Sequence, residues 1–303
     1  MSDYESLPSL SGDVSSTGVT LTNPEEGEPS FFENLGGVTV MVGSNQATVK
    51  RLVKQQLDAT TVSSYLAFTN VHPDLVDGKR RILPKATRIF YDYDHRQLIV
   101  KLVSIPHEAA ARNIDMGFRQ ELSRMGFRRL PIIPRGSGRI KGHTCCKEAD
   151  ASYRPKLLPP GRDIKWPSVV VEVGVSETWR QLRADAAWWL NNSSGDVKVV
   201  ILIGVSTSLP EIKFETVIAD PASLTLALRN NRIRYRPLTR QSVVLSRQAN
   251  QPAANITTVG ATALIIRFNE LCLRAPVAPE GDIRFSRQFL EDLADDVWDE
   301  LGV

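Results

Sequence analysis

The sequence predicts an α/β protein with a mixed sheet, and three observations support this class. Helical and strand-like patterns alternate between residues 106 and 205 in the order helix, strand, strand, strand, helix, strand. The last of these strands, residues 197–205, is almost wholly apolar, which is typical of a strand covered on both faces. With 303 residues and 42% hydrophobic side chains, the chain can bury a full core in one large domain or two small ones.

Each expected element follows from local spacing or capping signals. The helix over 46–66 rests on apolar residues at helical spacing, and the helix over 106–125 begins at a proline and ends before Gly126. Ser176 is a suitable N-cap for a helix that reaches residue 190. The other expected elements are a hairpin (88–93 and 98–103), strands near 139–145 and 148–153, a strand around Glu172, strands over 211–219, 224–229, 233–237 and 262–269, and a helix over 286–301.

Charge is distributed unevenly along the chain. Residues 1–49 hold seven acidic and no basic side chains, and residues 280–303 hold eight acidic and two basic ones. The totals are 37 basic and 34 acidic residues, so 35 basic and 19 acidic residues remain between positions 50 and 279. A basic body fits a polyanionic partner, because Lys and Arg release counterions from phosphates. The alternative is that these charges are spread evenly over the surface and serve only solubility.

The remaining composition indicates the cellular setting. Residues 1–35 are rich in Ser, Gly, Pro and Glu and predict a disordered acidic tail. The three cysteines form no CxxC pair and no zinc-like cluster, which favours a reduced intracellular protein, cytoplasmic or nuclear, with Cys145 and Cys146 buried in a strand. The sequence has no apolar run long enough to span a bilayer and no signal-peptide pattern, so we expect no membrane association.

Two acidic residues on neighbouring expected strands form the candidate site. Asp150 lies in a short alternating run that ends at Pro155, and Glu172 interrupts the apolar run 169–173. A carboxylate inside such a strand is costly to bury unless it is paired or bound to a metal. Two acids at adjacent strand ends, followed by a helix, are what a Mg²⁺-dependent phosphodiesterase needs. They are also what a structural polar pair would look like.

The segments around these acids resemble the PD-(D/E)XK nuclease superfamily, in particular a restriction-endonuclease branch known as a domain of unknown function. The matching segments are VKLVSIPHEAA with His107, the pair Gly136-Ser137, the strand of Asp150, and WPSVVVEVGVS with Glu172. The resemblance extends over about 120 residues, roughly 40% of the chain.

The resemblance implies a restriction-endonuclease-like αβββαβ core with a mixed sheet over residues 88–210. A helical segment (36–87) would precede this core, and a β/α extension (211–303) would pack on it. It also implies phosphodiester hydrolysis with one or two Mg²⁺ (or Mn²⁺) ions held by Asp150 and Glu172, since carboxylates suit hard cations. Nucleic acid is the expected partner, DNA in preference to RNA, and a homodimer is compatible with this class.

The lysine that completes the family's site is not where the resemblance places it. Gly174 stands two residues after Glu172, and Asp185 occupies the alternative place four residues before Trp189. Arginine could stabilise charge on a phosphate but could not act as a base. The nearest basic candidates are Arg180, Arg183 and Lys147.

His107 and a basic segment complete the candidate site. His107 would either take part in the site or be an ordinary oriented histidine at the start of a helix. The segment 126–142 carries five basic residues before Asp150 and would either track a nucleic-acid backbone or form a solvated loop.

Two functions follow as hypotheses. The first is a metal-dependent nuclease in which Asp150 and Glu172 hold the metal, with Arg180, Arg183 or Lys147 near the phosphate. The second is a catalytically degenerate nuclease-fold protein that binds nucleic acid or another protein, which the missing lysine favours. A third reading is a chance resemblance in another α/β protein, in which the two acids would not share a site.

Overall fold

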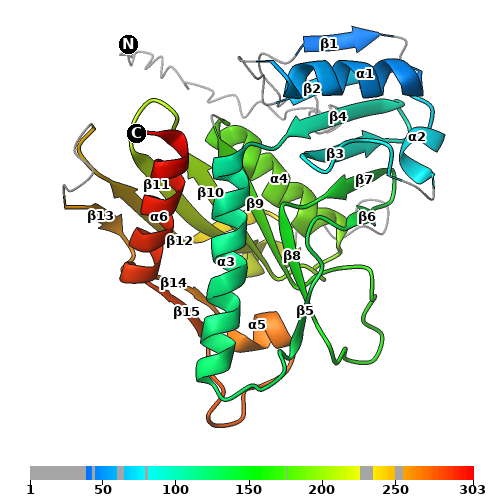
Figure 1. Ribbon diagram of the computed structural model, residues 1–303. Coiled ribbons are helices and arrows are strands. Elements are labelled where there is room, and N and C mark those ends of the chain that lie inside the picture. The colour runs from blue at the N-terminus through cyan, green and yellow to red at the C-terminus, as the bar shows by residue number, and fades with distance from the viewer. Residues whose placement is uncertain are drawn as a thin grey trace, which may run out of the picture.

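The computed structural model describes residues 39–42, 45–59, 65–78, 81–175, 177–225, 235–249 and 255–303. Within these ranges the chain forms two large mixed sheets, a two-stranded sheet and the helices packed around them (Figure 1). The α/β class with a mixed sheet is therefore confirmed. The expected disordered tail, residues 1–35, lies outside the described residues.

The first sheet has six strands in the order β1-β2-β4-β3-β7-β6. Its elements are β1 (Thr39–Val42), β2 (Tyr65–Thr69), β3 (Thr87–Asp92), β4 (Gln97–Leu102), β6 (Arg139–Lys141) and β7 (Cys145–Glu148), with helices α1 (Gln46–Leu57) and α2 (Asp74–Asp77). The predicted hairpin is confirmed as the antiparallel pair β3–β4. The predicted helix over 46–66 is wrong beyond Leu57, where α1 ends. The residues from Tyr65 onward form β2 instead, because their side chains are mostly buried and their backbone pairs with β4.

The second sheet has seven strands in the order β13-β12-β11-β10-β9-β8-β5. Its strands are β5 (Ile132–Pro134), β8 (Ala151–Pro155), β9 (Val169–Val175), β10 (Val199–Val205), β11 (Glu211–Ala219), β12 (Pro237–Ser246) and β13 (Thr257–Gly260). Strand β8 runs antiparallel to both β5 and β9, whereas β9 and β10 are parallel. The predicted strands around Glu172, over 197–205 and over 211–219 are confirmed as β9, β10 and β11.

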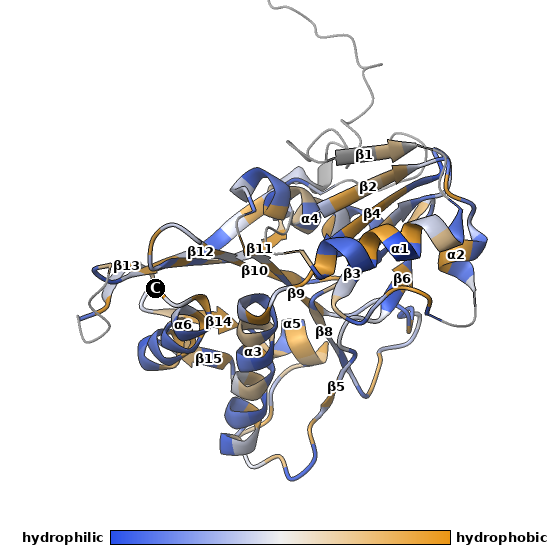
Figure 2. Ribbon diagram, turned by 45° about the horizontal axis from the view of Figure 1, so that its top comes forward, coloured by the Kyte–Doolittle hydropathy of each residue, from blue (hydrophilic) through white to orange (hydrophobic). Residues whose placement is uncertain are grey.

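Helices cover both faces of the second sheet, and strand β9 is buried between them (Figures 1 and 2). Helices α3 (Ile105–Arg124) and α6 (Arg287–Leu301) share one apolar core with Val169 and Val171. Helix α4 (Trp179–Asn192) packs with Val170 on the other face, as the alternation of side chains along a strand requires. The predicted helices over 106–125 and 286–301 are confirmed.

The start of α4 differs from the prediction. The helix is capped by Thr178, whose hydroxyl accepts the Gln181 N–H at 3.3 Å while the Gln181 side chain accepts the Thr178 N–H at 2.8 Å. Ser176, the expected cap, lies outside the described residues.

The chain passes from the first sheet to the second between β7 and β8. Strand β7 ends at Glu148 in the first sheet and β8 begins at Ala151 in the second. The predicted strands over 139–145 and 148–153 are therefore divided into β6, β7 and β8. Asp150, which the sequence places inside a strand, lies instead in the connection where the two sheets meet.

The C-terminal region departs most from the sequence prediction. A continuous strand over 262–269 is wrong: β14 (Ala263–Ile266) is followed by helix α5 (Phe268–Cys272) and pairs with β15 (Ile283–Ser286). Strand β13 is mostly exposed, and β12 has only a short apolar run, Val243 to Leu245, so neither has the long apolar or alternating pattern that marks a strand in a sequence. Of the predicted strands over 224–229 and 233–237, residues 226–234 lie outside the described residues. The described parts are not separate strands: residues 224–225 end a 3-10 helix (Pro221–Thr225), residues 235–236 are irregular, and residue 237 begins β12.

Burial agrees with the expectations for individual residues. Cys145 and Cys146 are unpaired and buried on β7, and Trp189 is fully buried, as the sequence predicts. Among the described helices, none combines the length and the apolar character needed to cross a bilayer.

Candidate functional site

Asp150 lies at the junction of the two sheets, and nitrogen atoms from four elements, β3, β4, α3 and β9, surround its carboxylate. Its Oδ2 accepts the N–H of Val173 at 2.7 Å and lies 3.1 Å from Nζ of Lys101 and 3.0 Å from Nε2 of His107. Its Oδ1 lies 3.4 Å from Nε of Arg88. The Asp150 side chain is 0% exposed, so these protein groups, rather than water, compensate its charge.

Glu172 lies on the face of β9 that is covered by α4. Its Oε1 accepts the indole N–H of Trp189 at 2.5 Å and lies 3.6 Å from Nζ of Lys147. The Glu172 side chain is 2% exposed. A buried carboxyl group that receives one neutral donor and a more distant ammonium group is compensated only in part.

Lys147 of β7 and Asp185 of α4 form a buried ion pair next to Glu172. Both side chains are almost inaccessible, at 7% and 2% exposure. Lys147 is one of the basic residues that the sequence offers in place of the missing lysine, and the structure places it beside Glu172. Asp185, the acid found where the related branch would carry a lysine, holds Lys147 in this position.

The buried charged side chains around Asp150 and Glu172 form one cluster, which also contains Lys101, His107, Lys147, Glu177 and Asp185. Lys101 of β4 was not identified in the sequence analysis. Its Nζ lies 3.1 Å from Asp150 Oδ2, 2.5 Å from the carbonyl oxygen of Val173 and 3.1 Å from Glu177 Oε1. A lysine that follows the apolar run Leu98 to Val100 in β4 is the signal that could have identified it, and Arg88, which precedes the apolar run Ile89 to Tyr91 in β3, is a similar signal.

The two acids differ in the state that their surroundings favour. Burial raises the pKa of Asp150, but His107 and Lys101 outweigh burial and hold that pKa well below its ordinary value. Burial raises the pKa of Glu172 to about 8, because Lys147 offsets burial only in part and nearby carboxylates add repulsion. At neutral pH, Asp150 is therefore ionised and Glu172 is mostly protonated.

Both buried lysines remain charged. Burial lowers the pKa of Lys101, but Asp150 and Glu177 outweigh this effect and raise the pKa above its ordinary value. Lys147 follows the same pattern, since the attraction of Asp185 and Glu172 exceeds the effect of burial and raises its pKa. The cluster is thus a set of fixed positive charges facing carboxyl groups.

The two arginines predicted for a phosphate lie on the exposed side of α4. The Arg183 side chain is 54% exposed, and its Nη2 lies 3.0 Å from Oε1 of Glu215 on β11. Arg180 is exposed as well. Neither position is buried with Asp150 and Glu172, and a role for these arginines near a phosphate remains a prediction.

Some basic residues of the segment 126–142 contact other parts of the protein. Arg135 donates to two carbonyl oxygens of the loop before β9, at 2.6 and 3.1 Å. Arg139 lies 3.1 Å from Oε1 of the buried Glu148. Arg128, Arg129 and Lys141 are exposed, so these three residues present most of the charge of the segment to solvent.

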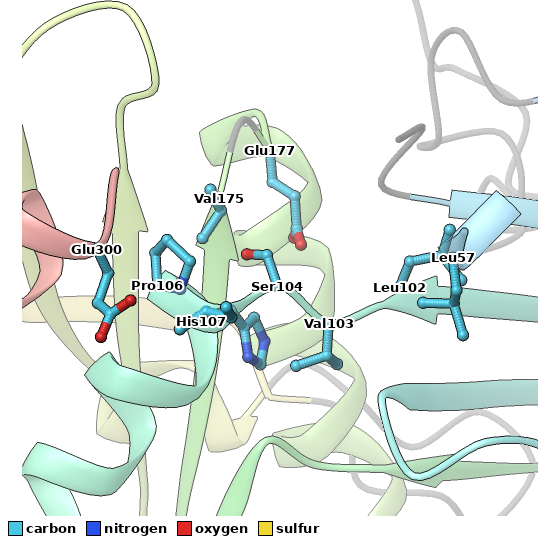
Figure 3. Close-up of a pocket in the computed structure, with 10 residues that line it drawn as sticks. Leu57, Leu102, Val103, Ser104, Pro106, His107, Val175, Glu177 and Glu300 are labelled. Atoms are coloured by element: carbon cyan, nitrogen blue, oxygen red, sulfur yellow. The ribbon is translucent and has the colours of Figure 1, made fainter. Parts of the chain in front are cut away.

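A cavity of about 440 Å³ lies beside the cluster at the N-terminus of α3 (Figure 3). His107 and Glu177 belong to both the cavity wall and the cluster, and Figure 3 shows them on either side of Ser104. Much of the remaining wall is apolar, including Leu102 and Val175.

A second cavity, of about 20 Å³, lies inside the cluster. Its wall includes Lys101, Lys147, Glu172 and Asp185. A polar cavity of this size has room for about one water molecule. The interior of the cluster is therefore too small for a phosphodiester group.

The residues around Asp150 and Glu172 do not fit a Mg²⁺ ion as they are arranged here. Mg²⁺ takes near-octahedral oxygen ligands at about 2.0–2.1 Å. Asp150 Oδ2 and the Val173 carbonyl already contact the ammonium group of Lys101, and Glu172 Oε1 already accepts from Trp189. In the part of the chain that the structure describes, no group of three or more His, Cys, Asp or Glu residues could hold a metal ion. Metal binding remains a prediction, and we derive no catalytic step from it.

Comparison with known proteins adds little to this geometry. No protein-family model matches the sequence, and no curated protein matches it either. A similar solved structure is a crystal structure from Anabaena variabilis, described as a candidate nuclease of the DUF820 family. The two chains share 9% identity, and the match covers 70% of this chain and 90% of the other. The TM-score of 0.33 is too low to carry an argument about fold or function.

Proposed function

We propose that this chain is a nucleic-acid-binding protein built on a nuclease-like α/β scaffold whose carboxylate centre no longer carries out hydrolysis. The element order α3-β5-β8-β9-α4-β10 supports the scaffold, because it repeats the αβββαβ order that the sequence resemblance implies, with β6 and β7 inserted. Asp150 lies immediately before β8, and Glu172 lies within β9.

The proposed loss of hydrolysis rests on the burial of the two carboxyl groups and on their contacts within the protein. As whole residues, Asp150 and Glu172 are 4% and 1% exposed. Their carboxyl groups contact basic side chains, a backbone N–H and an indole N–H of the protein itself. A scissile phosphate would have to reach these groups from solvent to be cleaved. The residue two positions after Glu172 is Gly174, so the usual lysine is missing from the strand as well.

Binding of nucleic acid is supported by charge. The 35 basic and 19 acidic residues between positions 50 and 279 leave a positive body. Arg128 and Arg129 are exposed in the segment between α3 and β5. Binding of this kind depends on phosphate contacts and weakens steeply with salt. DNA in preference to RNA remains the expectation.

A second candidate function is Mg²⁺-dependent phosphodiester hydrolysis, and one observation favours it. Asp150 Oδ1 is buried and accepts no hydrogen bond, although Nε of Arg88 lies 3.4 Å away as an ion-pair partner. A carboxylate oxygen without a donor is unusual in a protein interior and could serve as a ligand for a cation that displaced Arg88. Hydrolysis would require the ammonium group of Lys101 to leave Asp150 and Val173.

Fluorescence anisotropy with labelled duplex DNA, single-stranded DNA and RNA over a range of salt concentrations tests the proposal. We expect wild type to bind, and Arg128→Ala/Arg129→Ala to bind more weakly with a shallower salt dependence. Arg236→Ala serves as the control, because Arg236 is also an exposed arginine, 76% exposed and paired with Asp220. Absence of binding to all three nucleic acids at low salt would refute the proposal.

Plasmid nicking in Mn²⁺, followed on the same samples, separates the two candidate functions. Binding without nicking agrees with the proposed function. Nicking that disappears in Asp150→Ala would instead establish the nuclease.

A further inference from the structure

The ammonium group of Lys101 lies in a cage of three oxygen atoms from three separate parts of the chain. Asp150 Oδ2, from the β7–β8 connection, and Glu177 Oε1, from the segment before α4, each lie 3.1 Å from Nζ. The carbonyl oxygen of Val173 in β9 lies 2.5 Å from Nζ. The side chains of Lys101, Asp150 and Glu177 are 8%, 0% and 2% exposed, so the cage is closed to solvent.

These oxygens form a donor set that hard divalent cations prefer. Two carboxylates and a backbone carbonyl are typical ligands of Mg²⁺, Mn²⁺ and Ca²⁺. Two buried carboxylates also require a compensating positive charge. Between the three oxygens this charge is the ammonium group of Lys101, whose strand, β4, belongs to the other sheet. Arg88 and His107 contact Asp150 from outside the cage, at 3.4 and 3.0 Å.

The strand that carries Glu172 has no space for a lysine of its own. A Cβ atom on Gly174 would lie 2.8 Å from Cβ of Glu177 and 3.1 Å from Cδ1 of Leu182. Any side chain at position 174 would therefore displace Glu177, one of the three cage residues. The positive charge in the cage is therefore carried by Lys101 of β4.

We propose that the ammonium group of Lys101 permanently occupies the place of a divalent cation in this cluster, and that removing it converts the cage into a Mn²⁺ or Mg²⁺ site. The ligands of that site are Asp150, Glu177 and the carbonyl oxygen of Val173. The inference rests on the proposed function in treating the carboxylate centre as closed, but it does not depend on nucleic-acid binding.

Calorimetry and thermal unfolding with MnCl₂ test this inference on the full-length chain. Wild type is expected to show no Mn²⁺ binding in the cage, or binding at least about tenfold weaker than that of Lys101→Ala. The unfolding temperature of Lys101→Ala is expected to rise with the Mn²⁺ concentration. Lys101→Ala/Asp150→Asn is expected to lose the gained site. Lys198→Ala, which removes an exposed lysine that donates to the Gly195 carbonyl, controls for a general loss of positive charge.

Folding of the variants is part of the test. If Lys101→Ala unfolds without metal, Lys101→Met and Lys101→Ala are refolded with and without Mn²⁺, and recovery only with Mn²⁺ supports the inference. Variants that remain unfolded in both conditions, or fold without binding Mn²⁺, would overturn it. Equal Mn²⁺ affinity of wild type and Lys101→Ala would overturn it as well. Nucleic-acid binding without a Mn²⁺ gain would reject this inference alone and leave the proposed function intact.

Discussion

Lys147 on β7 pairs with Asp185 on α4, and this pair holds the lysine ammonium group 3.6 Å from Glu172 Oε1. The two residues are 38 positions apart and belong to a strand of the first sheet and a helix on the second. An acid in the helix, where the related branch would carry a lysine, thus places a lysine from another element beside the Glu172 carboxyl group. The positive charge near Glu172 therefore comes from β7, and not from β9 or from α4.

A double-mutant cycle on this pair is the first prediction. Lys147→Met and Asp185→Leu should each lower the free energy of unfolding by about 3–5 kcal/mol, because each removes the nearest opposite charge of a buried ionised group. The double variant should cost clearly less than the sum of the two single changes, since no unpaired charge remains. Denaturant unfolding of the four proteins gives the coupling energy, and additive effects would show that the pair is not coupled.

The second prediction concerns the space at Gly174. Gly174→Ala should destabilise the fold by about 1–3 kcal/mol, because the new Cβ would lie 2.8 Å from Cβ of Glu177. Gly281→Ala is the matched control, since a Cβ at that glycine has no neighbour within 4 Å. Thermal and denaturant unfolding measure both variants. Equal stability of the two would mean that Glu177 moves aside without cost.

The third prediction is a pH dependence that comes from Glu172. Its folded pKa of about 8 lies above the ordinary value of 4.5, so the folded state binds more protons between these values. The contribution of this group is therefore fully present below the ordinary pKa and is lost as the pH rises through about 8. In Glu172→Gln this loss should be absent. Denaturant unfolding at several pH values between 5 and about 8.5 compares the two proteins, and parallel curves would contradict the expected pKa.

The fourth prediction has the opposite sign and concerns Asp150. Its pKa is held well below the ordinary value of 3.8, so its contribution to stability is present above that value and is lost as the pH falls below it. Asp150→Asn should be less stable than wild type by about 3–5 kcal/mol near neutral pH, because Lys101 loses a buried partner. The difference should shrink in acid. A difference that stays constant down to acidic pH would exclude an ionised Asp150 as the cause.

Much of the second sheet and its helices could be predicted from the sequence. Strand β9 is an apolar run, helix α3 begins at a proline-containing turn, and α6 repeats apolar residues at helical spacing, so each pattern is local. Strands β2, β12 and β13 could not be predicted reliably. The apolar runs of β2 and β12 are too short to distinguish a strand from part of a helix, and β13 is mostly exposed. Their strand structure is established by pairing with distant strands, such as β2 with β4.

The sequence by itself determined that Asp150 and Glu172 are unusual, because a carboxylate in a buried strand region must be compensated. It also determined that no lysine stands two positions after Glu172, since position 174 is glycine. Only the tertiary structure decided which groups compensate the acids: Lys101 and Lys147 reach them from β4 and β7. Ion pairing depends on distances between side chains that are far apart in the chain, and those distances are fixed only when the two sheets meet.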